Sequence, residues 1–243
     1  MKIDALELQR LAAAQPRLDL YTSIHKALRA CMADTLVALG RADTGDDAQT
    51  QSAVQRVLDL LDLCEGHLAK ENKFVHAAME ARAPGSSDAL DHEHAEHEAH
   101  IAQLREGAAA LRDAPVSARP VAAQRLYQAL ALFVADNFRH MQVEETAHNA
   151  VLWAHYSDAE LAAIHDELVA SIPPQELMAA LRWMVPSFNA AERIGFLADV
   201  QAKAPAPAFE AMLQVARATL DDSDWHQLCT GLRLPAVPGL VQA

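Results

Sequence analysis

The sequence is poor in the residues that mark sheets and disulfide frameworks. It has 8 glycines, 3 tyrosines and 3 cysteines in 243 residues, whereas apolar residues make up 51% of the chain and charged residues 22%. A core can therefore be buried, and the balance favours helices over sheets. Cys31, Cys64 and Cys229 are odd in number and far apart, which gives no disulfide framework and suits a reducing compartment.

Basic residues are also scarce. The chain has 20 basic against 33 acidic residues, a net charge of −13, and no Lys/Arg block, so we expect no nucleic-acid partner. No run of 18 apolar residues occurs, and the N-terminal MKIDALELQRL carries acids where a signal peptide needs an apolar segment. We therefore expect a cytoplasmic protein without a membrane partner.

Apolar residues recur at steps of three and four along nearly the whole chain, without the alternation that is typical of strands. This predicts an all-α protein. After a short amphipathic helix at about 4–14, we expect four long helices, over about 18–40, 47–82, 88–112 and 118–153. The short loops between them predict an up-down-up-down four-helix bundle.

The chain changes character after the fourth predicted helix. Ser157 and Glu160 have the spacing of a capping box, Pro173–Pro174 begins another helix, and further prolines, including Pro186, break the following segment. We expect a bundle over 1–155 and a C-terminal helical extension over 156–243 that packs on it, without a fixed-period repeat. The extension is a candidate surface for a protein partner or for self-association.

The 12 histidines are the one compositional excess. Several are followed four residues later by a carboxylate, as in His67/Glu71, and helical phase separates these pairs. Nine residues turn an α-helix by about 180°, so with His67 on the apolar face, His76 and Glu80 point to solvent. On the third helix, the same reasoning turns His92 outward and His94 inward.

A set of ionisable side chains remains on the inner faces of the four helices. Buried without partners, such groups would cost several kcal/mol each, and no Lys or Arg shares their seam. A bound metal pair resolves this cost, because imidazoles and carboxylates without thiolates suit iron or manganese and two glutamates can bridge two ions. The predicted metal ligands are His25, His67, Glu71, His94, His97, His140 and Glu144.

The order of these residues resembles the hemerythrin-like, HHE cation-binding family over about 18–155. The resemblance is carried by His25, by HxxxE at 67–71, by EHAEHEAHIAQL and by HxxxE at 140–144. It implies a four-helix bundle with two iron ions in a non-haem di-iron centre, with manganese as the alternative metal.

The resemblance also implies roles for the ligands. Glu71 and Glu144 would bridge the ions, and the terminal ligands would be His25, His67, His94 and His140. On the third helix either His94 or His97, or both, would bind. The second motif is HxxxE, whereas oxygen-carrying hemerythrins have an Asp one residue further on, so the resemblance is to the broader bacterial group.

The resemblance implies a small ligand, O2, NO or H2O2, bound for sensing, carriage or stress protection. The alternative is a di-iron enzyme that reduces peroxide or NO, or that supplies iron for iron–sulfur cluster repair. Metal storage or a scaffold is the weaker alternative. An enzyme needs a path for protons and electrons to the metal, and the spacing suggests only one tyrosine near the predicted centre, Tyr21, one turn before His25. Binding is therefore favoured over catalysis.

Overall fold

The computed structural model describes residues 17–234, except for the side chains of residues 89 and 91. The helix expected at 4–14 lies outside the described residues. Within them no strand occurs, which confirms the all-α class. The described residues divide into two compact units, 17–22 with Met32–Ile172, and Ser23–Cys31 with 173–234.

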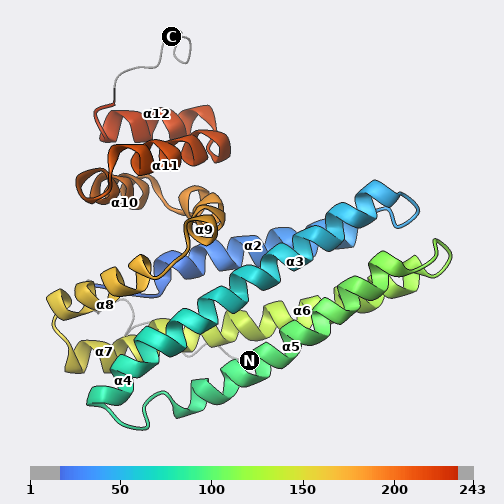
Figure 1. The fold of residues 1–243 in the computed structure, drawn as a ribbon, viewed down its shortest axis with the longest axis horizontal. Coiled ribbons are helices and arrows are strands. Elements are labelled where there is room, and N and C mark those ends of the chain that lie inside the picture. Colours follow the sequence, from blue (N-terminus) through green and yellow to red (C-terminus); the bar gives the residue numbers. More distant parts are fainter. Residues whose placement is uncertain (1–16, 235–243) are drawn as a thin grey trace, which may run out of the picture. The chain divides into compact units, whose positions relative to one another are not determined.

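The first unit is a helical bundle whose successive long helices run in opposite directions, as expected (Figure 1). The second and fourth predicted helices are continuous but each contains a π-helical segment. The elements are α2 (Thr22–Arg41), α3 (Asp47–Lys70), η1 (Glu71–His76), α4 (Ala77–Arg82), α5 (Asp88–Asp113), α6 (Arg119–Val143), η2 (Glu144–His148) and α7 (Asn149–His155).

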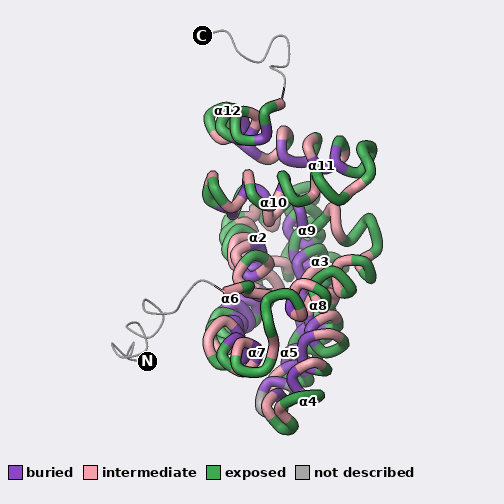
Figure 2. Tube along the Cα trace, turned by 90° about the vertical axis from the view of Figure 1, so that its left-hand side faces the viewer, coloured by how far each residue is buried: buried purple, intermediate pink, exposed green. Residues whose placement is uncertain are grey.

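The bundle helices bury one face each, as their three-and-four periodicity requires (Figure 2). α5 packs against both α3 and α6. At Gly40 a Cβ atom would lie 2.9 Å from Cε2 of Tyr127, so the absence of a side chain allows α2 and α6 to approach closely here. Asp46 begins α3 by accepting hydrogen bonds from the backbone N–H groups of Ala48 and Gln49.

The next helix, α8 (Asp158–Ala170), also belongs to the first unit. It begins with the predicted capping box of Ser157 and Glu160, and its buried Leu161 packs with Met79 and Leu152. The Tyr156 hydroxyl donates a hydrogen bond of 2.7 Å to the carbonyl of Ala78. This compact unit therefore continues past the boundary expected at 155/156.

The second unit has its own apolar core, formed by residues such as Leu181, Leu197 and Leu228. Helix α9 packs against α11, and α10 packs against α12. Pro186 is the second-last residue of α9, so the helix ends one residue after the break expected there. Besides the α2 residues Ser23–Cys31, this unit contains four helices among the described residues. They are α9 (Pro174–Ser187), α10 (Ala190–Lys203), α11 (Ala206–Thr219) and α12 (Asp222–Gly231).

Helices α9 to α12 begin sixteen residues apart. They therefore form two pairs of consecutive helices, α9–α10 and α11–α12, which repeat with a period of 32 residues and which we call hairpins. Pro173 and Pro205 precede the first helix of each hairpin, and the side chains of Asn189 and Asp221 cap the second. The expectation of no fixed-period repeat is therefore wrong here. The repeat lies in cap positions and burial rather than in residue identities, which is why a search for similar residues misses it.

Among residues 17–234, none of the helices combines the length and the apolar character that crossing a bilayer requires.

Candidate metal centre

Both HxxxE motifs end where an α-helix changes to a π-helix. Segment η1 begins at Glu71 and ends at His76, and segment η2 begins at Glu144 and ends at His148. All four of these side chains are buried. In a π-helix each residue turns the chain by less than in an α-helix, so the residues after each glutamate are shifted in phase. Short π segments are frequent at functional sites.

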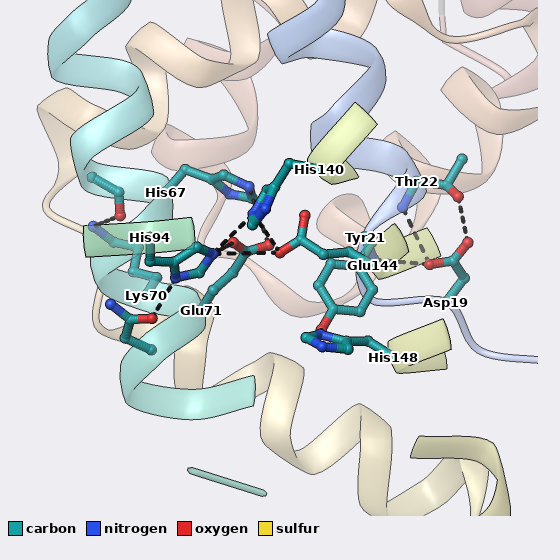
Figure 3. Close-up of polar contacts among 12 residues, drawn as sticks. Asp19, Tyr21, Thr22, His67, Lys70, Glu71, His94, His140, Glu144 and His148 are labelled. Carbon is teal, nitrogen blue, oxygen red and sulfur yellow. Dashed lines mark hydrogen bonds and ion pairs between the residues drawn. The ribbon is translucent and has the colours of Figure 1, made fainter. Parts of the chain in front are cut away.

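Four buried side chains converge in the interior of the bundle (Figure 3). Glu71, His94, His140 and Glu144 each offer one ligand atom, and these atoms lie within 4.8 Å of one another. Nε2 of His94 is 3.7 Å from Oε2 of Glu71 and 3.6 Å from Oε1 of Glu144. Nε2 of His140 is 3.3 Å from the same Glu144 oxygen.

His67 approaches the same two carboxylates from α3. Its Nε2 lies 3.1 Å from Oε1 of Glu71, and ligand atoms of His67, Glu71 and Glu144 all lie within 4.8 Å of one another. Glu71 and Glu144 are therefore shared by a group that contains His67 and a group that contains His94 and His140.

Oxygen atoms outside the cluster orient two of its imidazoles. Nδ1 of His94 lies 2.5 Å from Oδ1 of Asn72, and Nδ1 of His140 lies 2.9 Å from Oε2 of Glu93. These oxygens accept hydrogen bonds from Nδ1–H, so when the imidazole is neutral its Nε2 is the nitrogen that can bind a metal ion. Histidines that bind metals are commonly held in this way.

The carboxylates and imidazoles of the cluster shift each other's pKa values. Burial lowers the pKa of His140, but its hydrogen bond to Glu144, the charge of that carboxylate and Glu93 outweigh burial and raise this pKa to about 9. Burial and the charge of Glu71 raise the pKa of Glu144, yet hydrogen bonds from His140 and His94 outweigh them and lower it. A cation that displaces the His140 proton would take over its role as the positive partner of Glu144.

The donor set fits a bound cation. Two buried carboxylates supply negative charge and oxygen ligands, and at least three imidazoles supply nitrogen ligands, with no thiolate among the converging groups. Nitrogen and oxygen ligands of this kind suit iron or manganese.

Five of the seven sequence-predicted ligands thus converge, namely His67, Glu71, His94, His140 and Glu144. His25 lies on α2 and is fully buried, and its role as a ligand stays a prediction.

His97 is buried, as its phase predicted, but lies to one side of the converging groups. Its Nε2 is 3.7 Å from Oδ2 of Asp136, and its ring packs edge-on against His140 and Phe133. Burial and the nearby His140 lower the pKa of His97 to about 4. Its role as a ligand also stays a prediction.

Two further buried histidines were not predicted from the sequence. His76 is 3% exposed, so the prediction that it faces solvent is wrong, because the π-helical segment turns it inward. His148 is equally buried, and its Nδ1 lies 3.3 Å from the Tyr21 hydroxyl. A histidine four or five residues after the glutamate of each HxxxE motif was the available signal. The predictions for His92, whose side chain is 79% exposed, and for buried His94 are confirmed.

The family model of the hemerythrin HHE cation binding domain matches residues 17–152. No curated protein and no solved structure matches the chain. The family match covers more than half of the chain and includes every converging ligand of the bundle. The chain therefore belongs to the hemerythrin HHE family, and its bundle is a cation-binding domain.

Proposed function

We propose that the bundle holds a non-haem di-iron centre that binds O2, NO or peroxide for sensing, carriage or stress protection. The observation that carries the proposal is that two buried carboxylates, Glu71 and Glu144, belong both to a group with His67 and to a group with His94 and His140. A carboxylate can bridge two ions, so this arrangement suits a pair of cations better than a single one. Manganese is the alternative metal.

Each residue has a distinct task in this proposal. Glu71 and Glu144 would bridge the ions, His67 and His25 would be terminal ligands of one, and His94 and His140 of the other. When bound, the ions supply a redox-active pair at which a small ligand can coordinate. The chain keeps the ligands rigid and excludes bulk water, since His94, His140, Glu71 and Glu144 are all buried.

A second candidate is a di-iron enzyme that reduces peroxide or NO, or that supplies iron for cluster repair. The position of Tyr21 favours it, because this buried phenol lies 3.3 Å from His148 beside the cluster. Burial and the charges of Glu71 and Glu144 raise the pKa of Tyr21 well above 10, so the phenol holds its proton at neutral pH. An enzyme would turn over many equivalents of peroxide with an added reductant, whereas a binding protein would consume about one per centre.

The first experiment is purification in air without chelator, followed by elemental analysis and visible absorption spectroscopy. We expect about two irons per chain and charge-transfer absorption that changes when NO or peroxide is added. The matched control is His92→Ala, which removes an exposed histidine with Glu96 four residues later and should leave the metal content unchanged. A folded protein that takes up neither iron nor manganese would overturn the proposal.

A further inference from the structure

We propose that His76, Glu144 and His148 form a further position for a divalent transition-metal ion, adjacent to the proposed iron pair. Each offers one ligand atom, and the three atoms lie within 4.8 Å of one another. All three side chains are buried. Two histidines and one carboxylate are a ligand set of non-haem Fe(II), with coordination positions left open.

The backbone brings these histidines together in the same way on both helices. His76 ends η1 and His148 ends η2, and each segment begins at the glutamate of an HxxxE motif. α-Helical phase alone would have left His76 on the outer face. The two π-helical segments thus place in the interior two imidazoles that the HxxxE motifs do not need.

The orientation of His148 matches that of the other inward imidazoles. Asn72 and Glu93 place an oxygen next to Nδ1 of His94 and His140, and Tyr21 places its hydroxyl oxygen next to Nδ1 of His148. In the proposed site the Tyr21 oxygen accepts a hydrogen bond from Nδ1, so Nε2 is the ligand atom. Tyr21 is therefore a positioning residue for this ion.

The further position adjoins the iron pair and shares a ligand with it. The rings of His76 and His94 stack with centroids 4.7 Å apart, and Glu144 belongs to every group of side chains that could hold a metal in residues 17–234. Only two carboxylates, Glu71 and Glu144, take part in these groups, so little negative charge is left to balance a third ion. Cations at adjoining positions also repel one another. The further ion should therefore bind more weakly than the first two.

The test is titration of the metal-free full-length protein with Co2+, followed by equilibrium dialysis, elemental analysis and cobalt absorption. We expect two tightly bound ions and a third that binds at least tenfold more weakly. His76→Phe and His148→Phe keep a buried aromatic ring and should each lose the third ion while retaining the first two. Tyr21→Phe should weaken the third ion alone.

The matched control is His92→Ala, because the exposed His92/Glu96 pair is another place where a third ion could bind. Loss of the third ion in this variant would overturn the inference, as would saturation of the wild type at two ions or retention of three ions in both Phe variants. If both Phe variants fail to fold, an unchanged third affinity in Tyr21→Phe overturns it. Absence of the two tight ions would instead count against the proposed iron pair.

Discussion

Glu71 and Glu144 are the residues on which the proposed iron pair depends most, because each lies among several imidazoles in the bundle interior. We expect Glu71→Ala and Glu144→Ala to lose one or both ions and, with them, the stability that metal binding adds. Elemental analysis and thermal melting of the as-purified proteins measure both effects.

Glu80→Ala is the control for these variants. Glu80 also follows a histidine by four residues, but its carboxylate accepts hydrogen bonds from the backbone N–H groups of Gly85 and Ser87 at the turn before α5. This variant should disturb the turn and keep its metal. Equal metal content in all three variants would contradict the role of the two bridging glutamates.

Asn72 holds the imidazole of His94 from outside the cluster. Removing such an outer partner typically lowers metal affinity by about 10–100-fold, and we expect a loss of this size in Asn72→Ala. Competition with a chromophoric chelator measures it. An unchanged affinity would show that packing alone orients His94.

Glu160 should make stability depend on pH at the start of α8. Its hydrogen bond with Arg82 and those from Ser157 lower its pKa from 4.5 to about 2. A lowered pKa in the folded state means that the contribution is present above pH 4.5 and is lost as the pH falls from 4.5 toward 2. Glu160→Gln should therefore melt below the wild type at pH 7 and approach it near pH 2. A constant difference across this range would exclude the carboxylate charge as the cause.

At the scale of elements, hydrophobic periodicity predicted the long helices of the bundle well. The segment expected over 88–112 is α5, Asp88–Asp113, and the capping box at Ser157 occurs as predicted. Inward placement of His94 and His140 followed from the same rule. These predictions succeed where the helix keeps 3.6 residues per turn.

The same rule failed beyond Glu71, where the hydrogen-bonding register changes. A π-helical segment shows no distinct residue pattern, so counting at 100° per residue carried His76 to the wrong face. His148 lies four residues after Glu144, so regular helical spacing also turns it inward, and it was overlooked for no reason of phase. Five converging side chains were therefore predicted, His67, Glu71, His94, His140 and Glu144, whereas His76 could not be predicted from a regular helix.

The packing of α12 on α10 can be tested at two glycines, Gly231 and Gly195. A Cβ atom at Gly231 would overlap the side chain of Ile194, whereas one at Gly195 would meet nothing within 4 Å. Gly231→Ala should destabilise the second unit by about 1–3 kcal/mol, as overpacking typically does. Gly195→Ala should be neutral or should stabilise α10 by about 0.5–1 kcal/mol. Urea unfolding of the full chain measures both, and a neutral Gly231→Ala would contradict the close packing.

At the scale of the whole molecule, sensing and autonomous catalysis predict different behaviour of the second unit. A sensor should change the hydrogen exchange of α9–α12 when NO or O2 is added to the metal-loaded full-length protein, because its signal must leave the bundle. An autonomous enzyme should show changes only within the bundle. A protein partner or self-association through the C-terminal region stays a prediction, and exchange that is slowed at higher protein concentration would support self-association.

The spacing of the hairpins bears on how this chain could change in evolution. In stacked helical hairpins each unit contacts mainly its neighbours, so a duplicated or deleted unit leaves the remaining contacts in place. A gain or loss of 32 residues after Pro173 would keep every cap in register, whereas other lengths would put prolines and caps inside helices. Relatives of this protein should therefore differ in C-terminal length by whole hairpins.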